Sequence, residues 1–224
     1  MNMRLIGIAL VALALQGSYV RAAAPDDAAL DAPIEKFEAQ AGGEFHSLCK
    51  NVLKKPCGVE EISGDAERRD KELPHLRLSR TSGRKVLNTI AERSPGSRWA
   101  VRNGVINFEP KNLGDDPLSK KLDKVSLHGV SSFQAVRMVL DQAKIRFTYQ
   151  VGRGRFGIVD LELKNVTVRE ALNAIVNADG EVMWVFIHTL KRAGVKSQGT
   201  LMMPSWRKEG IGPHGEAPAN EKKQ

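Results

Sequence analysis

The middle of this chain repeats one pattern three times, and that pattern constrains the fold more than any single residue does. Each copy has an alternating apolar stretch, a short turn, a helix with one apolar face, and a second apolar stretch that carries an aromatic residue. The recurring positions are Leu78, Leu87, Ile90 and Trp99 in the first copy, Leu127, Val136, Val139 and Phe147 in the second, and Leu163, Leu172, Ile175 and Trp184 in the third. The spacing predicts three β-α-β units. Because one unit alone leaves a sheet face bare, we expect the units to pack together.

The first copy, residues 73–110, is predicted to end in a hairpin. Its helix has a candidate cap at Thr81 or Ser82. Asn103-Gly104 lies between two alternating apolar stretches, which is the strongest short signal for a hairpin turn. This copy is therefore predicted to be β-α-β-β, and the polar residues 111–123 are predicted to connect it to the next copy.

The second and third copies together occupy residues 124–190. Ser131 or Ser132 is placed to cap the helix of the second copy. Thr167, followed three residues later by Glu170, has the spacing of a capping box at the start of the third helix. The predicted fold class is α+β, with repeated β-α-β units whose small mixed sheets pack on helices, preceded by a short helical segment.

The stretch Val125–Trp184 resembles the short N-terminal domain of bacterial secretins and TonB-dependent receptors. The resemblance depends on an L-x-L strand at Leu161–Leu163 and on a helix that opens with T-x-x-E-A-L at Thr167–Leu172. It implies a periplasmic protein-docking or signalling module with two βαβ motifs. Leu76–Phe108 looks like a diverged half of the same unit. No pore or β-barrel sequence accompanies the resemblance, so a stand-alone soluble version is expected.

The first 22 residues have the layout of a cleavable secretory signal. The short positive stretch Met1–Arg4 precedes the unbroken apolar run Leu5–Leu15, and small residues follow the run. Cleavage is expected after Ala22, with Ala24 as a less favoured alternative because Pro25 would follow it. The apolar run is shorter than a spanning helix needs. We therefore expect a periplasmic or extracellular protein with no stable membrane insertion.

The charge of the chain does not select a partner. The full sequence has a net charge of +8, and loss of the two arginines in the signal leaves 32 basic against 26 acidic residues. A moderate basic excess bears on solubility and non-specific binding rather than on fold. Nucleic acid is a poor partner for an exported chain, and an anionic envelope surface is a weaker alternative to a protein partner.

Residues 23–72 are predicted to form a helical segment and a linker. Apolar residues with helical spacing run from Phe45 to Leu53 and include Cys49. Cys49 and Cys57 are the two cysteines of the chain, and an isolated pair in an oxidising compartment favours a disulfide. Such a loop would contribute about 2–3 kcal/mol. A metal site that adds His46 falls short of the four ligands of structural zinc.

Motifs of catalysis and cofactor binding fail on their context. Gly152–Gly157 spells G-x-G-x-x-G, but a predicted strand follows it where a dinucleotide site needs a helix. The sequence thus predicts no catalytic, cofactor or metal residues and no enzyme. Arg153 and Arg155 in this connector are candidate partner contacts, as is Trp206 in the predicted flexible basic tail, residues 191–224. Packing of Trp206 back on the domain is the open alternative.

The function predicted from the sequence is an exported binding or adaptor module of the bacterial cell envelope. A protein partner is expected to engage a sheet edge or the tail. A structural subunit of an envelope assembly is the alternative, and a cell-envelope hydrolase is less favoured because it needs a nucleophile and base or a metal set.

Overall fold

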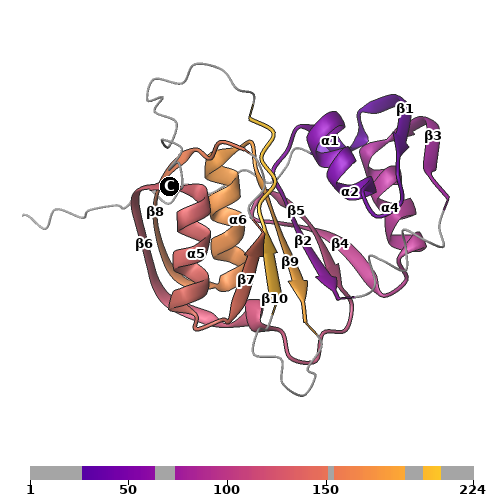
Figure 1. Ribbon diagram of the computed structural model, residues 1–224. Coiled ribbons are helices and arrows are strands. Elements are labelled where there is room, and N and C mark those ends of the chain that lie inside the picture. Colours follow the sequence, from indigo (N-terminus) through magenta and orange to yellow (C-terminus); the bar gives the residue numbers. More distant parts are fainter. Residues whose placement is uncertain (1–26, 64–73, 151–153, 190–198, 208–224) are drawn as a thin grey trace, which may run out of the picture.

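The computed structural model describes residues 27–63, 74–150, 154–189 and 199–207, and it shows an α+β protein. Two modules with the same order of elements follow one another (Figure 1). After the short helix α1 (Asp27–Asp31), the first module contains β1 (Pro33–Ala39), α2 (Glu44–Ser47), the π-helical η1 (Leu48–Leu53), β2 (Cys57–Ile62), β3 (Leu76–Ser82), α4 (Gly83–Arg93), β4 (Ser97–Arg102) and β5 (Val105–Pro110). The short helix η2 (Pro117–Ser119) leads to the second module, which contains β6 (Lys121–Ser131), α5 (Ser132–Gln142), β7 (Phe147–Gln150), β8 (Ile158–Thr167), α6 (Val168–Asp179), β9 (Met183–His188) and β10 (Gly199–Met202).

Strand pairing follows the same plan in both modules. The two opening strands of each module form an antiparallel pair, β1 with β3 and β6 with β8. In each module, two strands directly follow a helix, and we call these the returning strands. The last strand of the module lies between them, parallel to one and antiparallel to the other. In the first module β5 lies between β2 and β4, and in the second β10 lies between β7 and β9. The modules are thus two copies of one topology.

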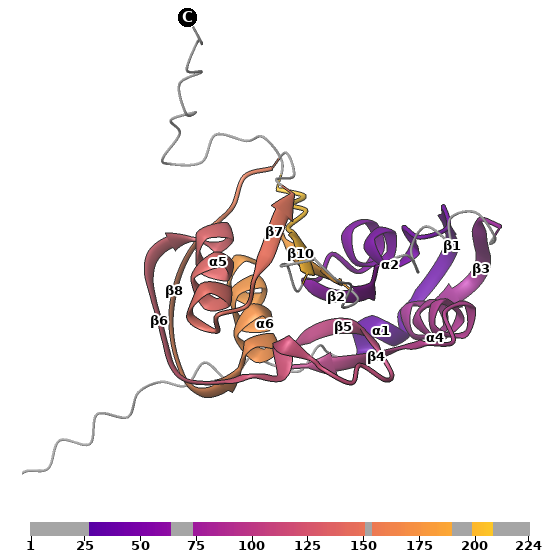
Figure 2. The same ribbon diagram turned by 60° about the horizontal axis from the view of Figure 1, so that its bottom comes forward.

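The two modules share one sheet because β2 pairs in parallel with β9. The resulting strand order is β4-β5-β2-β9-β10-β7, with β4 and β7 at the two ends. Helices α5 and α6 lie on one side of this sheet, and α2 and α4 lie on the other (Figures 1 and 2). The strand pair of each module lies outside its helices.

Side-chain alternation along β9 gives each face of the sheet its own core. Trp184 and Phe186 point into the core of the second module, whereas Met183 and Val185 pack against that of the first. Leu172 is fully buried in the same core as Trp184, as the repeat predicts.

The helix caps form where the sequence indicates them. Ser131 with Gln134 and Thr167 with Glu170 both make capping boxes, and the Ser82 hydroxyl accepts from the backbone of Lys85 at the start of α4. The turn between β4 and β5 places Asn103 and Gly104 at positive φ, as a two-residue hairpin requires.

The same hydrogen bond, from a tryptophan indole to an asparagine, occurs within the first and the third copies. The Trp99 indole donates to Asn88 Oδ1 at 2.8 Å, and the Trp184 indole donates to Asn173 Oδ1 at 3.0 Å. Each asparagine directly follows the leucine that recurs at the same position of the repeat, Leu87 in the first copy and Leu172 in the third. The repeat therefore extends beyond apolar spacing to a polar contact between helix and returning strand.

Two parts of the predicted organisation need correction. Residues 23–72 contain the strands β1 and β2 as well as the predicted helix, so the half-copy seen at Leu76–Phe108 is completed by a fourth β-α-β unit at its N-terminal side. The prediction of a flexible tail over 191–224 is wrong for residues 199–207, because β10 lies inside the sheet and Ser205 bridges to Val182. No helix in the described part of the chain is long and apolar enough to cross a membrane.

Replacement of Leu172 by alanine tests the shared core of the second module. Because Leu172 is fully buried, we expect the free energy of unfolding to fall by about 2–5 kcal/mol. Met138→Ala on the exposed face of α5 is the matched control and should change it by less than about 0.5 kcal/mol. Denaturant unfolding measures both, and equal effects would contradict the assigned packing.

Candidate functional site

A buried cluster of charged residues lies where the two modules meet. Arg169 on α6 donates to both carboxylate oxygens of Glu60 on β2, at 2.5 and 2.9 Å, and to Asp116 before η2 at 2.7 Å. His188 on β9 contacts the same Glu60 carboxylate at 3.1 Å. Glu60 is 1% exposed and the Arg169 side chain 15%. The guanidinium therefore ties the second module's helix to the first module's strand.

Burial alone would raise the pKa of Glu60. Hydrogen bonds from His188 and Arg169, together with the positive charge of Arg169, overcome that effect and hold the pKa below its usual value. Glu109 on β5 behaves in the same way, because Arg102 and Arg98 on β4 donate to it. Both carboxylates are therefore ionised partners in an ion-pair network at neutral pH.

The same cluster includes the residues that come closest to a metal site among those described. Ligand atoms of Glu60, Asp116 and His188 lie within 4.8 Å of one another. The Arg169 guanidinium already contacts both carboxylates and supplies the positive charge that a cation would bring. The geometry thus favours an ion pair that joins the modules over a metal centre.

Cys49 on η1 and Cys57 on β2 lie side by side in the first module's core. Both are free thiols in this structure and both are fully buried. Burial, followed by the hydrogen bond and charge of Cys49, raises the pKa of the Cys57 thiol. His46 does not join the two thiols in a group of potential ligands within the described residues. The disulfide stays a prediction, and the placement of the thiols is compatible with it.

The three candidate partner-binding residues do not form one surface. Arg153 lies outside the described residues. Arg155 is exposed, and its carbonyl oxygen accepts from the Ser205 hydroxyl at 2.7 Å. Trp206 is half-buried against the first module's core, and its backbone N–H donates to Glu181. The structure therefore shows the alternative for Trp206, in which it packs back on the domain.

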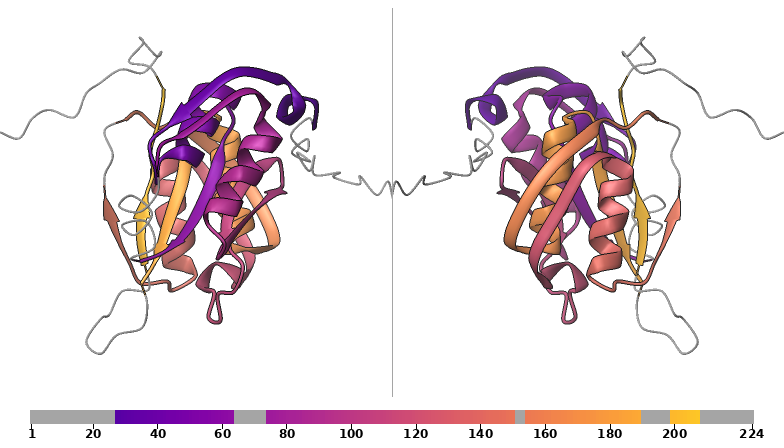
Figure 3. Two further views of the ribbon diagram at one scale, coloured as in Figure 1. Left: turned by 90° about the vertical axis from the view of Figure 1, so that its right-hand side faces the viewer. Right: turned by 90° about the vertical axis from the view of Figure 1, so that its left-hand side faces the viewer.

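The edge strand β7 borders an open groove of about 480 Å³. The groove is lined by Arg137 and Asp141 on α5, by Lys144, Ile145 and Arg146 in the following turn, and by Phe147 and Tyr149 on β7. Figure 3 shows β7 at the outer edge of the sheet beside β10. Three basic side chains and one acidic side chain thus surround a strand edge that has no strand partner within the described residues.

An aromatic cluster stands at one end of this groove. The Tyr149 side chain is 50% exposed and meets Phe133 edge-on, with ring centroids 6.0 Å apart. Phe133 stacks on Phe156 of the connector at 5.3 Å. The Arg137 guanidinium lies 5.1 Å from the centre of the Tyr149 ring, which is a cation–π distance.

Sequence reasoning missed Arg137, although the repeat contains the signal for it. Arg137 follows Val136, so it occupies the helix position that Asn88 and Asn173 hold in the first and third copies. There the asparagine bonds a buried or half-buried tryptophan, whereas Arg137 covers the exposed Tyr149. At the β7 edge, the second copy thus has an exposed cation–π contact at the helix position where the first and third copies have an asparagine bonded to tryptophan.

Comparisons with models of protein families, with curated proteins and with solved structures found no match to this chain.

Arg169→Met tests the ion pair between the modules. At neutral pH we expect it to lower the free energy of unfolding by about 3–5 kcal/mol, because it leaves the Glu60 carboxylate buried without its main partner. Since the folded pKa of Glu60 is lowered, the wild type loses this stabilisation as the pH falls below about 4.3. The difference in free energy of unfolding between the wild type and Arg169→Met should therefore become smaller in acid.

The control for this pH series is Arg77→Met, which removes an exposed pair with Glu38 on β1 and should have little effect. Two results would contradict a stabilising ion pair at the joint between the modules. One is a decrease in the free energy of unfolding for Arg169→Met that is no larger than for the control. The other is a difference between wild type and Arg169→Met that stays constant down to acid pH.

The predicted disulfide is tested by unfolding envelope-derived protein in a thiol reagent without reductant. Unfolding is necessary because both side chains are fully buried and would resist labelling in the folded state whether bonded or not. We expect no labelled cysteine before reduction and both labelled after it. Labelling of both cysteines before reduction would mean that they are free thiols in the native protein.

Proposed function

We propose that this protein is an exported protein-binding module of the cell envelope, and that β7 accepts an extended segment of a partner protein as an additional strand. The observation that carries the proposal is the joint between the modules. In the first module, the outer edge of β2 is filled by β9, a strand from the other module. The pairing of β2 with β9 is thus one example, within this chain, of such an outer strand edge binding a further strand.

β7 is the counterpart of β2 in the second module. Each is the first returning strand of its module, and each pairs in parallel with its module's last strand, β2 with β5 and β7 with β10. β2 is filled on its other side, whereas β7 has no further strand partner among the described residues. An exposed strand edge presents unpaired backbone groups that a strand from another chain can satisfy.

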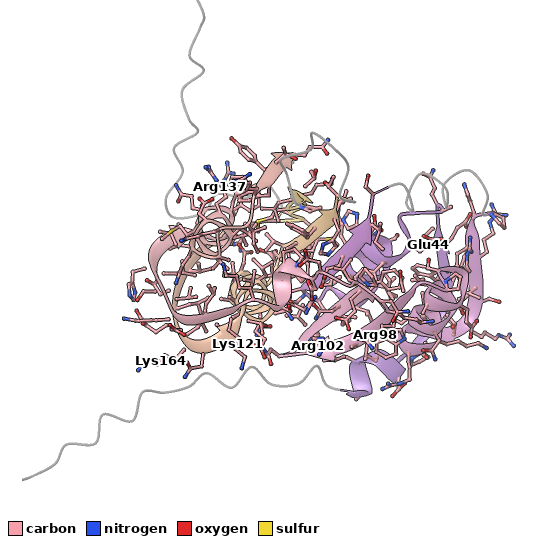
Figure 4. The ribbon with its side chains drawn as sticks, turned by 90° about the horizontal axis from the view of Figure 1, so that it is seen from below. Glu44, Arg98, Arg102, Lys121, Arg137 and Lys164 are labelled. Atoms are coloured by element: carbon pink, nitrogen blue, oxygen red, sulfur yellow. The ribbon has the colours of Figure 1, made fainter. Side chains whose placement is uncertain are left out.

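The opposite sheet edge, β4, has side chains that are engaged internally. Arg98 and Arg102 both bond Glu109, and the Trp99 indole bonds Asn88. Figure 4 shows Arg98 and Arg102 near one another, and Arg137 on the other module. On β7, by contrast, Tyr149 is half exposed, and an open groove lies beside the strand. These differences favour β7 as the binding edge.

The resemblance to the short N-terminal domain of secretins and TonB-dependent receptors supports the same proposal. Two βαβ motifs are present between Lys121 and His188, and the L-x-L and T-x-x-E-A-L segments fall on β8 and α6. We propose export because residues 1–22 have the layout of a secretory signal, and we propose a non-enzymatic binding role because of the open edge and groove at β7.

A structural subunit is the second candidate, because the joint between modules suggests how copies could assemble. β4 corresponds to β9, so β4 of one copy could pair with β7 of the next as β9 pairs with β2. Contacts of this head-to-tail kind generate rings or filaments. Arg98 and Arg102 on β4 outnumber their shared partner Glu109, so the basic residues that line the groove at β7 would oppose this pairing.

A photoreactive phenylalanine analogue in place of Tyr149 distinguishes the two candidates in cells. We expect an adduct with another envelope protein, with the cross-link confined to one extended segment of that protein. The same analogue in place of Val101, which is exposed on β4, is the control and should give no such adduct. An adduct between two copies of this chain would favour the structural subunit, and no adduct at Tyr149 would overturn the proposal.

A further inference from the structure

We infer that the segment bound at β7 is acidic and runs parallel to β7, an inference that rests on the function proposed above. It assigns the α5–β7 groove, lined by Arg137, Lys144, Arg146 and Tyr149, to the side chains of that segment.

The geometry of the edge directs alternate side chains of an added strand into the groove. Phe147 and Tyr149 share one face of β7, and Tyr149 contacts Phe133 on α5, so this face is the one that α5 covers. Thr148 and Gln150 point to the opposite face. A strand that pairs with β7 must place every second side chain on the α5 side, where the groove lies.

The charges along the groove select acidic side chains on that face. Arg137, Lys144 and Arg146 line it against a single acid, Asp141. Arg137 also lies over the exposed Tyr149 ring, so a carboxylate from the added strand would approach a guanidinium held in place by an aromatic face. Charge complementarity of this kind sets specificity and association rate at an interface.

The direction of the bound strand follows from the equivalent edge. β9 runs parallel to β2, with Gly58 opposite Trp184 and Ile62 opposite His188. Because β7 corresponds to β2, a strand received in the same way runs parallel to β7. The N-terminal end of the segment would then lie near Phe147 and its C-terminal end near Gln150.

The test uses the full mature protein and capped peptides of about six residues, the common length of a strand. One peptide alternates Glu with Val, and matched peptides carry Gln or Lys in place of Glu. Titration followed by NMR should show that the Glu peptide binds about tenfold more tightly than the Gln peptide at low salt, with a difference that shrinks as salt screens the charges. Exchange of β7 amide hydrogens should slow in the complex.

Two further measurements test the groove and the direction. Arg137→Glu combined with Lys144→Glu should abolish the preference for the Glu peptide. The matched control, Lys121→Glu combined with Lys164→Glu, reverses two exposed charges on β6 and β8 and should retain it (Figure 4). Because positive charge near the end of α5 also favours the helix, unfolding curves must show both variants folded. A paramagnetic tag on the peptide's N-terminus should broaden the resonances of Phe147 more than those of Gln150.

The outcomes separate this inference from the proposed function. Equal binding of the Glu, Gln and Lys peptides at β7 would overturn the acidic segment but leave strand addition intact. Strong broadening at Gln150 would overturn the parallel direction alone. If no peptide slows exchange in β7 while the Tyr149 analogue still cross-links a partner protein, the acidic strand is wrong and the binding role survives.

Discussion

The parallel pairing of β2 with β9 is the interaction on which the rest of the structure depends. It fuses two three-stranded sheets into one, and it buries β9 on both faces, with Trp184 toward one core and Met183 toward the other. Gly58 makes the close approach possible, because a β-carbon there would lie 2.3 Å from the Trp184 ring. On the same face, Glu60 meets Arg169 from α6. Packing and a buried ion pair therefore act together at one joint.

The joint also explains why the sheet edges are not equivalent. The three-stranded sheets of the two modules have four outer edges between them, and the joint fills two, leaving β4 and β7 at the ends of the fused sheet. Arg98 and Arg102 on β4 both form ion pairs with Glu109. At β7, the helix position that carries an asparagine in two other copies carries Arg137 and faces a groove. A duplicated module thus becomes asymmetric where function is proposed.

The sequence predicts the three strong repeats, their caps and the Asn103-Gly104 turn, because apolar spacing and turn chemistry are local signals. It fails on the fourth unit, since β1 buries only Phe37 and Ala39 and β2 contains Gly58, Glu60 and Glu61, which are poor strand formers. Those residues make sense only against Trp184 and Arg169, far away in sequence. β10 was missed for the same reason. Arg137 could have been singled out by aligning the copies at Asn88 and Asn173, but its groove depends on the tertiary placement of β7.

Cross-strand NMR contacts between β2 and β9 test the central claim most directly, which is that two like modules are fused through these strands. The account predicts close contacts in parallel register, with Gly58 opposite Trp184 and Ile62 opposite His188, and slow amide exchange in both strands. Rapid exchange of the β2 amides with no contact to β9, in a protein whose second module remains folded, would contradict the fused sheet and the equivalence of the edges drawn from it.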